Sequence, residues 1–329
     1  MDNIFKQFSQ FEVARYRIVL QAQTEAVLPA LIGSTLRGAF GHALKAISCC
    51  VPHKNCRICF LSDACLYTTV FEPTSPKLKD IPRPFVFEPP IPPLTREISK
   101  NSTLKLRVAE NGKISFDFIL MGKTIKKLPY FIYAFELLAR HGLGVSRQSF
   151  KISEVFSIDA NSNLQMVYAP HETKILLHQN FDLGNYIQRR ITELKIKNKL
   201  KINLLTPLRI RRNRDDLLEK ITFTDLFKQC SLRLKFLSEN YGNSLEYDYQ
   251  NLMNKTRDIL TFEDKLWRHN FTRHSNRQNK KFDLDGMLGE IEFHSDNFAG
   301  VLPFIIAGEF LNIGSASSLG LGKFTVEFV

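Results

Sequence analysis

Four cysteines in the first quarter of the chain have the spacing of a metal site, C-x5-C-x2-C-x5-C: Cys50, Cys56, Cys59 and Cys65. Four thiolates complete a tetrahedral zinc site, and Cys49 can take the place of Cys50. Since four protein ligands leave no open coordination position, we expect such an ion to be structural rather than catalytic. An iron–sulfur cluster uses the same thiolates and ranks below zinc, and reduced thiols without a ligand are the third interpretation.

A glycine-rich segment near the C-terminus, residues 314–322, has a composition typical of a phosphate-binding loop. Its glycines, Gly314, Gly320 and Gly322, carry no side chain that would block backbone N–H groups from converging on phosphate oxygens. It lacks the Gly-Lys-Ser/Thr ending of a Walker A loop, and it follows an expected helix where a dinucleotide fingerprint would follow a strand. A turn that binds nothing is the alternative interpretation.

Two tracts carry dense positive charge. Residues 189–214 contain ten Lys or Arg and one acid, and residues 265–281 contain six Lys or Arg and no acid. Such density favours strong, salt-dependent binding of phosphates, while a solvated surface is the usual alternative. The expected phosphate contacts are Arg209, Arg211, Arg212, Arg273, Arg277, Lys280 and Lys281.

The composition agrees with a globular, basic protein. The 329 residues are 44% hydrophobic, and 45 Lys plus Arg against 33 Asp plus Glu give a net charge of +12. This excess favours a polyanionic partner such as nucleic acid, with an anionic membrane surface as the rival. No stretch approaches the roughly 18 apolar residues of a spanning helix, and the first ten residues lack the apolar region of a secretory signal, so we expect a cytoplasmic protein that is not in a membrane.

The periodicity of the first half predicts alternating strands and helices with two interruptions. Eight of the 14 prolines fall in residues 72–93, which predicts a surface loop without helix or interior strand. The Asn111-Gly112 pair predicts a tight hairpin turn. The expected elements are a strand over 12–27, a helix over 35–47, hairpin strands over 104–109 and 113–120, a helix over 130–141 and a strand over 150–158.

The second half repeats this order. Residues 194–205 predict a strand with an apolar face and a basic face, the latter formed by Lys195, Lys197, Lys199 and Lys201. The remaining expected elements are a helix over 222–241 with Cys230 in its apolar stripe, strands over 260–271 and 288–293, a helix over 298–311 and a strand over 323–329. Each half therefore reads βαββαβ, and the fold class is α+β with tandem ferredoxin-like (RRM-like) domains. We place the domains at residues 1–175 and 176–329.

Several segments, in order along the chain, resemble a known family. Leu36-Arg37-Gly38-Ala39-Phe40-Gly41-His42-Ala43-Leu44-Lys45, followed by the cysteines and Phe71-Glu72-Pro73, resembles the N-terminal signature of the CRISPR repeat-processing endoribonucleases of the RAMP (repeat-associated mysterious protein) superfamily. Similar segments follow at residues 205–209, 273–278, 286–290, 307–309 and 320–322.

The resemblance implies that the protein binds CRISPR repeat RNA and cuts it into guide RNAs without a catalytic metal. In this family the ribose 2′-OH attacks the adjacent phosphate and leaves a 2′,3′-cyclic phosphate. His42 is the leading catalytic candidate, because relatives often carry a catalytic His on the first helix. Lys45 would stabilise the developing charge, Arg37 of the same signature would contact RNA, and His274 is the second histidine candidate.

The sequence departs from the family pattern at two positions. Relatives often have His shortly before the glycine loop and Lys just after its first glycine, whereas this chain has Asn312 and Ser315. The alternative function is therefore a catalytically weak or inactive subunit that holds guide RNA among other CRISPR effector subunits. A third class of function is that of a metal-stabilised nucleic-acid adaptor unrelated to RNA processing.

Overall fold

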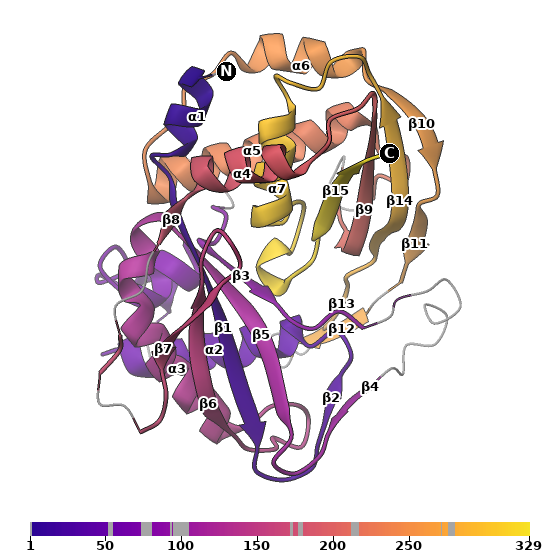
Figure 1. The fold of residues 1–329 in the computed structure, drawn as a ribbon. Coiled ribbons are helices and arrows are strands. Elements are labelled where there is room, and N and C mark those ends of the chain that lie inside the picture. The colour runs from indigo at the N-terminus through magenta and orange to yellow at the C-terminus, as the bar shows by residue number, and fades with distance from the viewer. Residues whose placement is uncertain are drawn as a thin grey trace.

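The chain forms two lobes, each with an antiparallel sheet (Figure 1). The computed structural model describes all residues except 1, 52–54, 74–80, 93, 95–104, 172–173, 177–179, 212–216, 271 and 276–279. Within the described part, no helix is both long and apolar enough to cross a membrane.

The sheet of the N-terminal lobe has the strand order β3-β5-β1-β6-β7. Its centre is β1, where Ile18 lies opposite Phe116 on one side and Val155 on the other. The helices α2 and α3 pack on one face of this sheet, where their apolar stripes meet alternate residues of β1. The bounds are β1 Glu12–Ala22, α2 Gly33–Ser48, β3 Phe85–Glu88, β5 Lys113–Met121, α3 Leu128–His141, β6 Phe150–Ile158 and β7 Leu164–Tyr168.

The order β1-α2-β3-β5-α3-β6 confirms the predicted βαββαβ unit, but the second strand was misplaced. It is β3, which lies inside the Pro-rich segment and is buried along its whole length, so the prediction of a surface loop over 72–93 is wrong for these four residues. Pro84 and Pro89 flank it, and the strand takes an edge position where few backbone donors are needed.

The predicted hairpin at Asn111-Gly112 is also wrong as a strand pair. The turn exists, with Asn111 at a φ of 61°, but the strands on either side join different sheets. β4 (Lys105–Val108) pairs with β2 (Ala26–Pro29), while β5 pairs with β1 and β3. The long strand predicted over 12–27 is accordingly divided between β1 and β2.

Aromatic packing fixes the two helices of this lobe on their sheet. The Phe40 ring of α2 lies 5.0 Å from the Phe135 ring of α3 and 5.5 Å from Phe118 of β5, between ring centroids. Tilted and edge-to-face pairs at these separations add to the stabilisation from burial. The opposite face of α2 is thereby directed to solvent.

The C-terminal lobe repeats the unit, as predicted. Its sheet has the order β10-β14-β9-β15, with β11 also paired to β14, and α5 and α7 cover one face. Thr222 and Asp225 form a capping box that starts α5. The bounds are β9 Lys199–Leu208, α5 Phe223–Tyr241, β10 Leu260–Asp264, β11 Trp267–His269, β14 Gly286–His294, α7 Leu302–Leu311 and β15 Phe324–Phe328.

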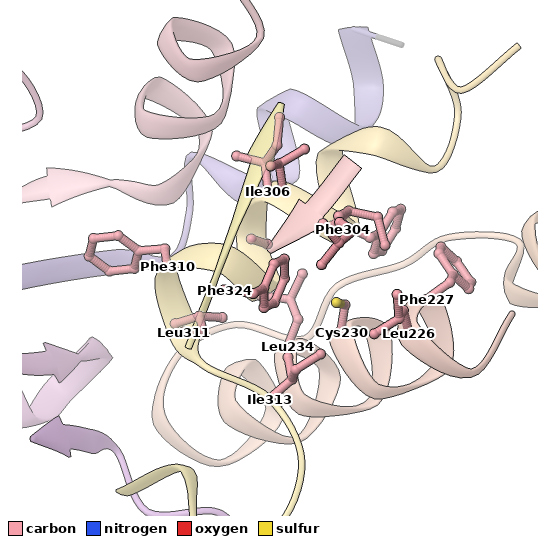
Figure 2. Close-up of a cluster of buried hydrophobic side chains, with 14 of the residues drawn as sticks. Leu226, Phe227, Cys230, Leu234, Phe304, Ile306, Phe310, Leu311, Ile313 and Phe324 are labelled. Atoms are coloured by element: carbon pink, nitrogen blue, oxygen red, sulfur yellow. The ribbon is translucent and has the colours of Figure 1, made fainter. Parts of the chain in front are cut away.

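Cys230 belongs to the core of this lobe, which confirms its predicted role. It is 1% exposed and lies among Leu226, Phe227 and Phe304 where α5 crosses α7 (Figure 2). Burial raises the pKa of its thiol. Gly308 of α7 permits this crossing, because a Cβ there would lie 2.3 Å from the sulfur.

The two lobes share apolar packing. Residues of the first sheet, including Val13, Val86, Ile119 and Met121, belong to the same buried cluster as the helices of the second lobe. The chain passes between the lobes through β8 (Phe181–Asp182), which pairs with β1, and α4 (Leu183–Glu193), which packs on α7. The other elements are α1 Asp2–Phe8, η1 Cys56–Ile58, η2 Tyr67–Phe71, η4 Gly122–Lys127, α6 Tyr249–Arg257, β12 Thr272–Ser275, β13 Lys280–Asp283 and η5 Ser317–Leu319.

Candidate functional site

The helix α2 presents the predicted catalytic residues on its outer side. His42 is exposed, whereas Leu36, Phe40 and Leu44 point into the core. Lys45 is half-buried, with its Nζ 5.6 Å from the centroid of the Tyr67 ring. The helix therefore offers an imidazole to solvent with an ammonium group one turn away.

Arg37 lies against the N-terminal lobe. Its guanidinium carbon is 4.4 Å from the centroid of the Phe71 ring, in a cation–π arrangement, and the side chain is partly exposed. Phe71 in turn fills the space beside Gly41, where a Cβ would lie 2.2 Å from the ring. This packing holds Arg37 near the start of α2, nearer than His42 to the second lobe.

The first residue of α2 touches the glycine-rich loop. A Cβ on Gly33 would lie 2.0 Å from the carbonyl oxygen of Leu319, and one on Gly320 would lie 2.5 Å from that of Phe87 in β3. The loop is thus wedged between α2 and β3 of the other lobe. Because His42 is nine residues along the helix from Gly33, it lies about 13 Å from this contact along the helix axis.

The hydrogen bonds of the loop use several of the amides in the predicted phosphate nest. The N–H of Gly320 donates to Ser317 O (2.9 Å) and that of Gly322 donates to Pro207 O (3.1 Å). Gly314 has a φ of 77°, and a Cβ there would lie 2.7 Å from Arg209 O. The glycines serve close backbone packing at the lobe junction, and two of the three amides predicted to bind RNA are used inside the fold.

The two positions that depart from the family pattern differ in exposure. Asn312, which ends α7 at a φ of 54°, is fully buried, and its amide group donates to Leu321 O at 3.3 Å. Ser315 is exposed, and its backbone N–H donates to Arg209 O. Asn312 is therefore part of the loop's internal support rather than a group that faces a ligand.

A charged cluster at the lobe junction was not predicted. Arg15 and Arg17 of β1 both donate to Asp117 of β5 at 2.8 Å, and Arg15 also donates to Glu88 of β3 at 2.8 Å. Lys323, just before β15, donates to the same Glu88 carboxylate at 2.7 Å. Alternation along β1 indicated two faces, but the sequence contained no signal for partners about 70 to 230 residues apart.

The carboxylates of this cluster keep its arginines charged. Burial lowers the pKa of Arg15, but the charges of Glu88 and Asp117 outweigh it, so that the pKa is raised. The pKa of Arg17 is raised mainly by its hydrogen bond to Asp117. Arg17 is 39% exposed and so presents positive charge on the sheet face beside the second lobe.

Arg209 is placed differently from the prediction. It is 2% exposed, and its NH1 lies 3.2 Å from Asp285 Oδ1, so it forms a buried ion pair rather than a phosphate contact. Arg211 is exposed at a bridge to Leu217 and remains a candidate contact. Arg212 lies outside the described residues.

The second basic tract follows β11 into the strand pair β12–β13. Arg273 and His274 lie on β12, opposite Phe282 and Lys281 of β13. Lys280 begins β13, and Arg277 lies outside the described residues. The tract is thus a hairpin attached to the second sheet, and its RNA contacts remain predictions.

The predicted basic face of β9 is limited to Lys199 and Lys201, which alternate with buried apolar residues. Lys195 and Lys197 precede the strand. The side chain of Lys201 points away from the core, but its Nζ lies 3.5 Å from Glu290 Oε2 and 3.0 Å from Glu327 Oε1. Cross-strand carboxylates therefore neutralise much of the charge that a single strand's sequence indicated.

Four of the cysteines line a groove in the N-terminal lobe. A groove of about 390 Å³ at the ends of α2 and α3 is lined by Cys49, Cys50, Cys59 and Cys65 among others, and both Cys56 and Cys65 pack against the core. Among the described residues, no three His, Cys, Asp or Glu side chains gather as metal ligands. The Cys50, Cys56, Cys59 and Cys65 zinc site therefore stays a prediction.

Family models match both halves of the chain. Residues 11–180 match AF_1859_N, an N-terminal domain, and residues 202–324 match the CRISPR-associated endoribonuclease Cas6. No curated protein matches the chain.

Solved structures share the fold over nearly the whole chain. A chain of a partial Cas6-RT-Cas1–Cas2 complex has a TM-score of 0.60 at 11% identity, covering 98% of this chain and 47% of its own length. The Thermus thermophilus Cas6 has a TM-score of 0.53 at 12% identity, covering 96% of this chain and 98% of that one. The chain thus spans about half of the first relative and nearly all of the second.

Proposed function

We propose that the chain, which belongs to the AF_1859_N family over residues 11–180 and matches Cas6 over residues 202–324, is a RAMP-type CRISPR repeat-processing endoribonuclease that binds CRISPR repeat RNA and cuts it into guide RNAs. The observation that carries the proposal is the exposed His42 on a helix whose first residue touches the glycine-rich loop of the Cas6 domain. The substrate would be the precursor transcript, and the products would be repeat-derived guide RNAs.

The proposed chemistry is transesterification within the RNA. His42 removes the proton from the ribose 2′-OH, the 2′-oxygen attacks the adjacent phosphorus, and the bond to the 5′-oxygen breaks. The leaving oxygen takes up a proton, which gives a 2′,3′-cyclic phosphate and a 5′-OH end. Lys45 stabilises the negative charge that grows on the phosphate oxygens.

Basic residues of both lobes supply the binding energy in this proposal. Arg17 and Arg211 are candidate contacts with described side chains, and the β12–β13 hairpin adds Arg273, Lys280 and Lys281. Each phosphate that they neutralise would steepen the salt dependence of RNA binding. Arg209 is left out because of its burial and its ion pair with Asp285.

One experiment tests the cleavage proposal. Purified protein is incubated with its own repeat RNA in EDTA, and product ends are mapped. We expect a 2′,3′-cyclic phosphate at one position, and a loss of about 100-fold or more in single-turnover rate for His42→Ala with unchanged RNA affinity. His171→Ala, at another exposed histidine, is the control. Wild-type rates for His42→Ala would refute the catalytic assignment.

A second candidate function is favoured by Asn312 and Ser315. If the residues that relatives have at these positions take part in cleavage, this chain would hold guide RNA without cutting it, in a complex with other CRISPR proteins. Tight repeat binding with no product in the assay above would support this alternative. We propose the cytoplasm as its site of action in either case.

A further inference from the structure

A second basic and aromatic surface lies on α3 and the turn before it. We call this the α3 surface, and all of its members are exposed: Lys123, Lys126, Lys127, Tyr130, Tyr133 and Arg140. None of these residues was singled out by the family resemblance. Their exposure means that the packing of the N-terminal lobe does not account for them.

The positive charge of this surface is largely uncompensated. Glu136 is the single acid between residues 123 and 140. Its Oε1 accepts a hydrogen bond from the Tyr168 hydroxyl at 3.0 Å, and its Oε2 lies 3.9 Å from Arg140 NH2. Within the described part of the chain, the three lysines have no carboxylate within ion-pair distance. A polyanion is therefore the complementary partner for this surface.

The two tyrosines are unusual for a helix that packs on a sheet. Tyr130 is 54% exposed and Tyr133 is 57% exposed, while the neighbouring Phe131 and Phe135 are fully buried. Residues three apart on a helix are neighbours on its surface, so the two rings form one exposed aromatic platform. Aromatic rings beside cationic side chains are typical of sites where unpaired bases stack.

The α3 surface is connected to the helix that carries His42. Lys127 and Tyr130 line the 390 Å³ groove together with Ile47 and Ser48 at the end of α2. Ile47 is five residues beyond His42, or about 8 Å along the helix axis. A strand of RNA can therefore run from the tyrosines over the end of α2 toward His42.

We propose that the α3 surface binds the single-stranded RNA that flanks the cleavage position, with the lysines on phosphates and Tyr130 and Tyr133 stacked on bases. The inference rests on the proposed function, because it names the path of that substrate. Single-stranded rather than paired RNA is indicated, since bases within a helix do not offer their faces to side chains.

Two RNAs test the inference, the minimal repeat and the repeat with single-stranded extensions on both sides. We expect Tyr130→Ala/Tyr133→Ala to weaken binding of the extended RNA at least tenfold and to leave the minimal repeat within about twofold. Phe262→Ala is the matched control, because Phe262 of β10 is also 57% exposed. It should change neither affinity.

Charge variants give an independent readout. Lys126→Gln/Lys127→Gln should reduce the salt slope for extended RNA by about 0.7 per lost phosphate contact. Lys255→Gln/Arg257→Gln on α6, at the other end of the molecule in Figure 1, is the control. Equal affinities of wild type and tyrosine variant for the extended RNA would overturn the inference, and would leave this surface to an acidic protein partner.

Failure of the inference is distinguishable from failure of the proposed function. Cleavage of the minimal repeat reports the proposed function alone. Binding of a U-rich single strand, followed by fluorescence anisotropy, reports the α3 surface without any cleavage. The wild-type protein could cut no RNA while the tyrosine variant binds the oligonucleotide more weakly than wild type does. That result would support the α3 surface and refute the catalytic assignment.

Discussion

Lys323 and Glu88 join the two lobes through an ion pair in which Nζ lies 2.7 Å from Oε2. The Glu88 side chain is 4% exposed and also accepts a hydrogen bond from Arg15, so one buried carboxylate serves cations from both halves of the chain. Lys323 directly follows the glycine-rich loop, and the pair therefore holds that loop against the first sheet.

Removal of this carboxylate should destabilise the protein. Glu88→Ala leaves Arg15 without one of its partners and Lys323 without its carboxylate, and we expect the free energy of unfolding to fall by about 3 kcal/mol. Denaturation with urea measures this change. Glu154→Ala is the control, because its pair with Lys113 is partly exposed, at 50% for Lys113 and 29% for Glu154, and should contribute less than about 1 kcal/mol. Equal effects of the two variants would show that Glu88 does not link the lobes energetically.

The close contact between α2 and the loop predicts different effects for two glycines of one helix. Gly33→Ala places a Cβ 2.0 Å from Leu319 O, which must move, and we expect a loss of about 1–3 kcal/mol and slower cleavage because α2 carries His42. Gly38→Ala meets nothing within 4 Å and should gain about 0.5–1 kcal/mol. Thermal unfolding of both variants checks the prediction, and a stable Gly33→Ala would contradict it.

His269 makes stability depend on pH. It is 6% exposed, and burial lowers its pKa from the usual 6.5. The unfolded chain therefore binds a proton at this imidazole more tightly than the folded chain does. The stability that the neutral His269 contributes is complete above about pH 6.5 and is lost as the pH falls toward the lower pKa of the folded state. We expect His269→Gln to show a shallower fall in unfolding free energy between pH 7 and 5 than wild type. His171→Gln, at an exposed site, should match wild type; identical slopes for all three proteins would rule the effect out.

The zinc prediction has its own test. If the cysteine segment binds zinc, protein purified under reducing conditions should contain about one ion per chain, held by four thiolates. Cys59→Ser should lose the ion and the buried Cys230→Ser should keep it. Metal analysis by mass spectrometry provides the measurement, and a metal-free wild-type protein would favour reduced thiols.

Strong periodicity made most of the fold predictable from the sequence. The helices α2, α3 and α5 were placed within about three residues, because apolar residues recur at helical spacing on one face. The strand β3 was missed because Phe85 to Phe87 stand in a segment dominated by proline. Its assignment depends on pairing with β5, a contact across about 30 residues that periodicity does not encode.

The site was less predictable, since charge along the sequence does not reveal which cations have partners. Arg209 was predicted to contact RNA and Lys201 to lie on a basic strand face, yet Asp285 and Glu327 neutralise them from distant parts of the chain. His42 could be placed on an exposed helix face because its neighbours define the buried face. The Tyr130 and Tyr133 platform was overlooked because apolar stripes, rather than exposed rings, were used to locate α3.

The apolar packing shared between the lobes predicts that the chain unfolds as a single cooperative unit. Val13, Val86, Ile119 and Met121 are buried in one apolar cluster with residues of the second lobe. A truncation near residue 176 would separate the two lobes. Each fragment would then expose an apolar sheet or helix face to solvent. Melting of the intact protein should therefore occur in one step, and the separated halves should aggregate rather than act as independent modules.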